Sequence, residues 1–295
     1  MLASIDLGTN SARLLIGQVN RHRVITVRRH RIVTKMGTGL KETGHIERAA
    51  LARTAAALEE FRRLIEEHQA STVAIVATSA ARRAANVAEL VREVERIFGV
   101  KLRILDGREE AILSFKGALS VLPAGWRERM PVVIDIGGGS TEICFQAEDG
   151  LRALSLELGA VRLTENPISA AALRQKLVPL QGMLAGCQAF VLVGVGGTVT
   201  SLAAMEQRML VYDEEKINGY RLSRSTVDKW LAILASLTLA ERQKLPGLEP
   251  ARADIIVAGT QILQGIMDSL GAAEVLACEG DLLHGLLLEY QRLQG

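Results

Sequence analysis

The chain has 295 residues, enough for one large domain or two of ordinary size. Hydrophobic residues make up 48% of it and the formal net charge is +2, so it can build real cores and shows no global sign of binding nucleic acid or an anionic membrane. Three cysteines, Cys144, Cys187 and Cys278, form no CxxC pair, which indicates buried thiols in a reducing compartment. An acid at Asp6 argues against a signal peptide, and the uncharged run 189–205 is too short to span a membrane. We therefore expect a soluble, cytoplasmic protein.

The first half of the chain alternates strands and helices. Apolar runs around a glycine turn predict a strand at its start and then a hairpin that turns at "NRHR". Apolar spacing predicts a helix over 47–68, with Leu51, Leu58, Phe61, Leu64 and Ile65 on one face. Beyond it we expect a buried strand at "STVAIVATS", a helix over 81–99, a short strand at "KLRILDG" and a helix at "REEAILSFKGALSVL".

The second half repeats this order. "MPVVIDIGGGST" restates "LASIDLGTNS" as an apolar strand, an acid and a glycine loop, and a hairpin turning at "EDG" follows. Strands are expected at "AFVLVGVGGT" and "AEVLACE", with helices between them and a last helix from Asp281. A linker-like segment over 120–131 separates the halves. Two like units usually form a ligand site between them.

Three glycine loops carry the first chemical signal. "DLGTNS", "DIGGGST" and "GVGGTVTS" each follow an apolar run. Glycine lets the backbone turn sharply, and successive N–H groups in such turns bind anions with the help of hydroxyl groups. One loop would be read as a tight turn, but three favour phosphate binding. None is a Walker loop or a dinucleotide loop.

Acids give the second signal. Asp6 and Asp135 occupy matched places in the two repeats, and two carboxylates that face one another would repel unless a cation lay between them. Mg2+ fits this role, because it retains waters and binds phosphate oxygens. Glu109 and Glu110 begin a helix, where acids have the ordinary use of complementing the helix dipole.

In this order, the motifs resemble those of the exopolyphosphatase / guanosine pentaphosphate phosphatase family. The segments that match are "IDLGTNSARLLI", "VATSAARRAAN", "DGREEAILSFKGA", "VVIDIGGGSTEI", "SLELGAVRLTE", "GVGGTVTSLAAM" and "ARADIIVAGTQIL". The resemblance implies an α/β fold with two ribonuclease-H-like domains of the actin, Hsp70 and sugar-kinase superfold flanking a cleft. We expect an N-terminal domain over 1–122, with a C-terminal helix at about 286–295 packed back on it, and a second domain over 123–285.

The resemblance also implies an enzyme that hydrolyses phosphoanhydrides. Glu110 matches the general base that activates water, and Asp6 and Asp135 match the metal-side acids for Mg2+, with Mn2+ as an alternative. Arg82 would hold a phosphate by a bidentate contact, with Arg83 as the solvated neighbour, whereas a site role for Arg162 stays open. The phosphate-binding residues implied by the motifs and loops are Thr9, Asn10, Ser11, Arg82, Gly137, Gly138, Gly139, Ser140, Thr141, Gly196, Gly197 and Thr198.

The sequence departs from the family pattern at two places. Asn218 stands where a histidine is common, and Leu283 stands where an arginine is typical, so substrate contacts in the second domain are open. His284, beside Leu283, is read as a helix residue near the cleft and not as a ligand. The chain has no His-Asp dipeptide, so it resembles a short member of the family without the HD-type domain that helps to grip long polyphosphate.

A basic hairpin contains Arg21, Arg23, Arg28, Arg29, Arg31 and Lys35. It reads slightly better as a charged edge that discourages aggregation than as a surface for a polyanion. Without interleaved aromatic residues, nucleic acid is not expected as a partner.

The function expected from the sequence is an exopolyphosphatase that hydrolyses the terminal phosphoanhydride of inorganic polyphosphate, as a homodimer with no membrane partner. Guanosine pentaphosphate, a substrate linked to the stringent response, is the alternative within the same chemistry. A non-catalytic alarmone or nucleotide sensor, an actin-like assembly protein and a kinase-like phosphotransferase remain the alternatives of other classes. The general base at Glu110 favours catalysis, because a sensor has no need of one.

Overall fold

The computed structural model describes residues 1–123, 125, 129–184 and 189–294, and its chain divides into two compact units. The first comprises Met1–Ser120 together with the chain from Leu282 onward, and the second comprises Val121–Asp281. Cys187 and part of the expected linker over 120–131 lie outside the described residues. No described helix has the length and apolar character needed to cross a membrane.

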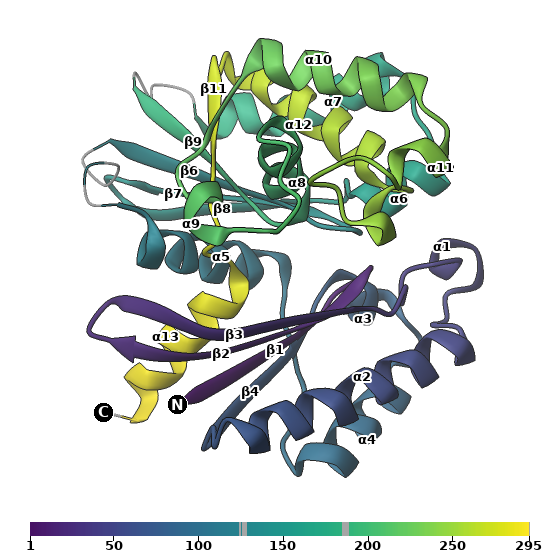
Figure 1. Ribbon diagram of the computed structural model, residues 1–295, viewed down its shortest axis with the longest axis vertical. Helices are drawn as coiled ribbons and strands as arrows, with labels where there is room; N and C mark the ends of the chain where they lie inside the picture. Colours follow the sequence, from purple (N-terminus) through teal and green to yellow (C-terminus); the bar gives the residue numbers. More distant parts are fainter. Residues whose placement is uncertain (124, 126–128, 185–188, 295) are drawn as a thin grey trace. The chain divides into compact units, whose positions relative to one another are not determined.

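The first unit is a five-stranded sheet with helices (Figure 1). Its strand order is β3-β2-β1-β4-β5, in which β1 pairs antiparallel with β2 and parallel with β4. In chain order, its elements are β1 (Leu2–Leu7), β2 (Ser11–Asn20), β3 (Arg23–Val33), α1 (Leu40–Thr43), α2 (Arg48–Glu67), β4 (Thr72–Ala77), α3 (Ser79–Arg83), α4 (Val87–Phe98), β5 (Arg103–Ile104), α5 (Gly107–Val121) and α13 (Leu282–Gln294).

Alternation along β1 and β2 gives this sheet two different faces. Ile5, Leu7 and Leu14 point into a core shared with α2 and α4, in which Phe61 is fully buried. Leu15 belongs to a separate core with the leucines of α13. The last helix therefore packs on the first sheet, beside β1, β2 and β3.

The second unit repeats the arrangement with a six-stranded sheet. Its order, β8-β7-β6-β9-β11-β10, places its first hairpin and parallel strands as in the first unit. In chain order, its elements are β6 (Met130–Ile136), β7 (Thr141–Ala147), β8 (Gly150–Leu156), α6 (Ala160–Glu165), α7 (Ala170–Met183), β9 (Phe190–Val195), α8 (Gly197–Glu206), α9 (Glu214–Ile217), β10 (Arg221–Ser223), α10 (Arg224–Ser236), α11 (Leu239–Arg242), a 3-10 turn (Pro250–Arg252), α12 (Ile256–Leu270) and β11 (Glu274–Ala277).

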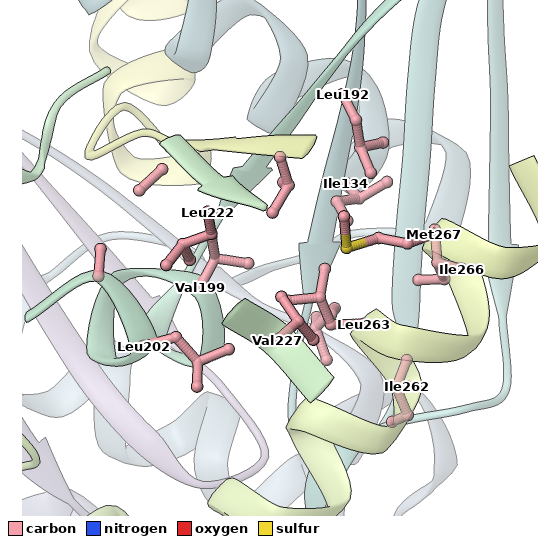
Figure 2. Packing of buried hydrophobic residues seen from close by; sticks show 14 of the residues in the cluster. Ile134, Leu192, Val199, Leu202, Leu222, Val227, Ile262, Leu263, Ile266 and Met267 are labelled. Atoms are coloured by element: carbon pink, nitrogen blue, oxygen red, sulfur yellow. The ribbon is translucent and has the colours of Figure 1, made fainter. Parts of the chain in front are cut away.

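The core of the second unit lies between this sheet and the helices α8, α10 and α12 (Figure 2). Ile134 and Leu192 from the sheet lie near Ile266 and Met267 of α12, and Val199 of α8 lies near Leu222 of β10. Aliphatic side chains dominate this core, as the low aromatic content of 3% requires.

The short helix α1 was not expected, and two further differences from the sequence-based expectation have a visible cause. The single helix expected over 81–99 is two helices, α3 and α4, separated at Ala84, whose backbone is extended. Asn86 holds this break by bonding both the N–H and the C=O of Ile46, which is a tertiary contact that local periodicity does not contain. Strand β10 was not expected, because its three residues become a strand only by pairing with β11.

Candidate functional site

The first glycine loop directly follows β1. The N–H of Gly8 donates to the carbonyl of Ser11 at 3.0 Å, which closes a tight turn between β1 and β2. The carbonyl of Asn10 accepts from the N–H groups of Thr34 and Lys35, and that of Thr9 accepts from Gly37. Thr9 and Ser11 are buried. The loop is therefore a fixed turn, supported by the segment that follows β3.

Asp6 lies opposite Arg13 on the neighbouring strand. Nε and Nη2 of Arg13 donate to Oδ2 of Asp6 at 2.9 and 2.6 Å. Cross-strand partners share one face of the sheet, and the guanidinium of Arg13 places a positive charge directly against this buried carboxylate. In the first unit, Arg13 therefore supplies part of the neutralisation that the sequence-based prediction assigned to a cation.

Glu110 and Arg82 are brought together. Arg82 lies in the last turn of α3, which follows β4, and its Nη1 donates to Oε2 of Glu110 at 2.7 Å and to the carbonyl of Leu105 at 2.8 Å. Glu110 is 8% exposed, in the first turn of α5. A buried acid with a positioned cation is the arrangement expected at a site and not on a helix surface.

The neighbouring Glu109 has a different task. Asp106 accepts from the N–H of Glu109 at 2.8 Å, and Glu109 accepts from the N–H of Asp106 at 2.9 Å, which is a reciprocal cap of α5. Glu109 also forms an ion pair with Arg103 near the surface. Glu109 therefore has the ordinary role of an acid at a helix N-terminus, whereas the carboxylate of Glu110 contacts Arg82.

The second glycine loop has the same internal turn as the first. The N–H of Gly137 donates to the carbonyl of Ser140 at 3.0 Å, as Gly8 does to Ser11. The carbonyls of Gly137 and Gly138 accept from the first N–H groups of α6. A Cβ at Gly159 would lie 2.4 Å from the carbonyl oxygen of Gly138, so glycine permits this close approach. Ser140 and Thr141 are buried beside Gly139 in the same loop.

Asp135 has a carboxylate as its cross-strand partner. It pairs in register with Glu142, so both acids share one face of the second sheet, and both are buried. Oε1 of Glu142 accepts from the hydroxyl of Ser155 at 2.7 Å. Glu142 was missed in the sequence, although its place seven residues after Asp135 matches that of Arg13 after Asp6.

The third loop joins β9 to α8. Gly196 has φ of +77°, and a Cβ there would lie 2.7 Å from Oδ1 of Asp135, so this glycine leaves room for the acid. Gly197 lies beneath the guanidinium of Arg252, because its Cβ would fall within 2.0 Å of three guanidinium atoms. Thr198 is buried against Gly259 of α12. The second unit thus brings Asp135 beside the third loop, with Arg252, a residue of the motif "ARADIIVAGTQIL" to which the sequence assigned no site role, as a neighbouring cation.

The two departures from the family pattern have structural roles. The side-chain oxygen of Asn218 accepts from the N–H of Glu279 at 3.1 Å, which joins the turn before β10 to the segment that follows β11. Leu283 is buried in the core of α13, and Ser4 donates to its carbonyl.

His284 is fully buried in the first unit, with Nε2 at 3.1 Å from Nη2 of Arg29. Arg162 forms an ion pair with Glu157 at 2.9 Å.

The donor sets fit a weakly held hard cation. Among the described residues, no group of three or more His, Cys, Asp or Glu side chains gathers as a metal cage. The pair of Asp135 and Glu142 supplies two buried carboxylates, and Mg2+ is commonly bound by one or two carboxylates together with waters and substrate phosphates. That Asp6 and Asp135 face one another across a cleft stays a prediction.

Solved structures first place the chain in a class. An exopolyphosphatase from Cytophaga hutchinsonii matches with a TM-score of 0.87 and 26% identity, covering 100% of this chain and 98% of that one. The Aquifex aeolicus member of the Ppx/GppA protein family matches with a TM-score of 0.81 and 29% identity over the same shares. The fold is that of the actin and sugar-kinase class, as expected.

Sequence comparison gives the family. The Ppx/GppA phosphatase family matches residues 15–293, and the chain belongs to this family. It is 33% identical to Exopolyphosphatase 2 of Mycobacterium tuberculosis, over 97% of each chain. It is 31% identical to a bifunctional 3-dehydroquinate synthase/phosphatase of Fusobacterium nucleatum and 27% identical to a guanosine-5'-triphosphate,3'-diphosphate pyrophosphatase of Aeromonas hydrophila. The chain spans 46% and 58% of the length of these two relatives.

Proposed function

We propose that the chain is an exopolyphosphatase, which releases the terminal phosphate of inorganic polyphosphate by attack of water. The observation that carries this proposal is Glu110, a buried acid held by Arg82 beside the cap formed by Glu109. The name of the Mycobacterium tuberculosis relative, similar over almost its whole length, supports the choice of substrate.

In the proposed reaction, Glu110 acts as the general base. Its carboxylate accepts a proton as the water oxygen bonds to the terminal phosphorus, and the bond from that phosphorus to the bridging oxygen breaks. Arg82 would orient Glu110 through their ion pair, and the two glycine loops with internal turns would hold phosphate oxygens through N–H and hydroxyl groups. The shortened polyphosphate leaves with the electrons of the broken bond.

Asp135 and Glu142 would hold Mg2+, with Asp6 as the acid proposed for the other unit. When bound, the metal would supply positive charge that stabilises the phosphoryl group during transfer. The room that Gly196 leaves beside Asp135 supports this assignment. The expected homodimer stays a prediction.

Guanosine pentaphosphate is the second candidate substrate, because the Aeromonas hydrophila relative is named for this chemistry. The deciding measurement is phosphate release from polyphosphate and from guanosine pentaphosphate, side by side, with Mg2+. Preference for guanosine pentaphosphate would replace the first proposal with the second, and release from neither would reject both.

Glu110→Gln tests the base directly. We expect turnover to fall by about two to four orders of magnitude, because the amide cannot accept the proton, while substrate binding is nearly unchanged. Glu109→Gln is the matched control, since this acid caps the same helix turn and should change stability but not turnover by such a factor. Turnover that survives in Glu110→Gln would show that another group is the base.

A further inference from the structure

The β2–β3 hairpin and its flanks concentrate positive charge. Between Asp6 and Glu42 the sequence contains no acid, and a total of +2 for the whole chain leaves the remainder with a net −6. The molecule is thus electrically asymmetric in spite of its balanced composition. The eight cations of this segment are Arg13, Arg21, Arg23, Arg28, Arg29, Arg31, Lys35 and Lys41.

Strand β3 presents this charge along an edge. Among the described strands it is the outermost of its sheet and pairs with β2 alone, so every second backbone N–H points outward. Register places Arg29 and Arg31 on the face of α13, opposite Leu15 and Arg13, whereas Arg28 points to the other face. Cations from both faces therefore flank one open edge.

Three arginines of the hairpin present their charge to solvent. Arg21, Arg23 and Arg28 are exposed and form no ion pair in the part of the chain that the structure describes. Nη2 of Arg29 lies 3.1 Å from Nε2 of His284, a ring nitrogen that accepts a hydrogen bond in the neutral form of the imidazole. The positive charge of Arg21, Arg23 and Arg28 is therefore not neutralised by neighbouring carboxylates of the described residues.

The hairpin leads directly to the first glycine loop. Strand β2 begins at Ser11, and the N–H groups that follow β3, those of Thr34 and Lys35, donate to the carbonyl of Asn10. Ten strand residues separate this loop from the turn at Arg21, which is about 30 Å of extended chain. An extended anion with its end at the loop can therefore follow the same edge.

The equivalent hairpin of the second unit shows that an edge does not require such charge. Strand β8 is also outermost, but its residues Gly150–Leu156 include one cation, Arg152. Its turn is acidic, at Glu148 and Asp149, and its strands have seven residues each, compared with ten and eleven in the first unit. Protection from aggregation alone does not explain why only the first hairpin is longer and basic.

We propose that the β2–β3 hairpin is a binding track for the distal phosphates of long-chain inorganic polyphosphate whose terminal phosphate lies at the loop of Thr9, Asn10 and Ser11. This proposal rests on the proposed function, because it assumes that polyphosphate is the substrate. The hairpin has no Phe, Tyr or Trp, so it lacks the stacking surfaces with which proteins bind single-stranded nucleic acid. Its arginines, which flank one edge from both faces of the sheet, fit a linear anion that lies along that edge.

Equilibrium binding provides the test, because it does not require turnover. Long-chain polyphosphate and tripolyphosphate are titrated into the wild-type chain and into Arg23→Gln/Arg28→Gln. For the double variant we expect a roughly tenfold loss of affinity for the long chain and no change for tripolyphosphate, because the short anion stays at the loop. Long-chain binding should also depend less on salt. The slope of log binding constant against log salt concentration should become shallower by about 0.7 for each phosphate that the variant no longer neutralises, as for flexible single-stranded polyanions.

Two controls separate local from general charge effects. Arg92→Gln/Arg174→Gln removes the same charge from exposed sites on α4 and α7 and should leave long-chain affinity unchanged. Arg23→Lys/Arg28→Lys keeps the charge and should retain most of the affinity. The proposal would be rejected if Arg92→Gln/Arg174→Gln lost as much affinity for long-chain polyphosphate as the hairpin variant did. It would also be rejected if Arg23→Gln/Arg28→Gln lost none.

A competition assay addresses the alternative polyanion. Single-stranded RNA at equal phosphate concentration should compete poorly, and equal competition would contradict the assignment to polyphosphate. The proposed function fails separately, since it requires phosphate release and the track requires only binding. If the chain binds long polyphosphate through the hairpin but does not hydrolyse it, the proposed binding track is supported and the proposed exopolyphosphatase activity is rejected.

Discussion

Arg13 and Glu142 show how one residue can differentiate two copies of the same motif. Each follows the acid of its repeat by seven residues and lies opposite that acid in register. In the first unit the result is an ion pair, Asp6 with Arg13, and in the second it is a pair of carboxylates. Two carboxylates on one face are the oxygen ligands that Mg2+ prefers, so we expect the second unit to hold the cation.

This difference predicts where metal affinity resides. Asp135→Asn and Glu142→Gln should each raise the Mg2+ concentration needed for half-maximal turnover by roughly tenfold or more, because each removes a charged oxygen ligand. The increase in melting temperature on adding Mg2+ should shrink in parallel, which gives a readout independent of activity.

Glu148→Gln is the control for that experiment, since it removes an exposed acid from the turn of the same β7–β8 hairpin. It should leave both measurements unchanged. If both site variants kept the wild-type Mg2+ dependence and thermal response, the metal would have to be held elsewhere.

Part of the candidate site is visible in the sequence, because it repeats. Asp6 and Asp135 end matched apolar runs before glycine loops, and that pattern is local. The contact between Arg82 and Glu110 joins residues far apart in the chain, and the division of labour between Glu109 and Glu110 depends on which carboxylate caps α5. Arg252 reaches Gly197 from a separate 3-10 turn, so no spacing in the sequence predicts it.

Helices and strands were predictable where burial is periodic. Helix α2, expected over 47–68, runs from Arg48 to Glu67 because its apolar residues repeat at helical spacing. The break between α3 and α4 was not predictable, since Asn86 makes it through contacts with Ile46. Elements set by tertiary hydrogen bonds are therefore those that local patterns miss.

The close packing of helix α13 on helix α5 predicts the effect of one substitution. A Cβ at Gly285 would lie 2.1 Å from the carbonyl oxygen of Leu113, which is backbone and cannot rotate away. Gly285→Ala should therefore lower the free energy of unfolding by about 1–3 kcal/mol, in spite of the better helix propensity of alanine, as measured by urea denaturation.

Gly182→Ala is the matched control in helix α7, because no described atom outside the glycine's own stretch of helix lies within 4 Å of its added Cβ. That change should be neutral or stabilising by about 0.5–1 kcal/mol. A Gly285→Ala chain as stable as Gly182→Ala would mean that α13 does not pack on α5 in this way.

At the scale of the whole molecule, the chain leaves the first unit at Ser120 and returns to it at Leu282. The returning helix contributes Leu282, Leu283, Leu286 and Leu287 to a core with Leu15 and Leu113. Four buried leucines contribute about 6–12 kcal/mol at roughly 1.5–3 kcal/mol each. That is comparable with the total stability of an ordinary domain, about 5–15 kcal/mol.

The two units should therefore differ when they are produced separately. Residues 121–281 hold a complete core and should unfold cooperatively alone, whereas residues 1–120 should not fold without the last helix. Joining 282–295 to 1–120 through a flexible linker should restore a cooperative transition, monitored by circular dichroism during urea denaturation. A fragment 1–120 that unfolded as cooperatively as the linked one would show that α13 covers a core already stable without it. Restoration of cooperativity only by the linked helix would show that α13 completes the core beneath the sheet that carries Asp6, so its truncation would also disturb α5, the helix of Glu110, through Leu113.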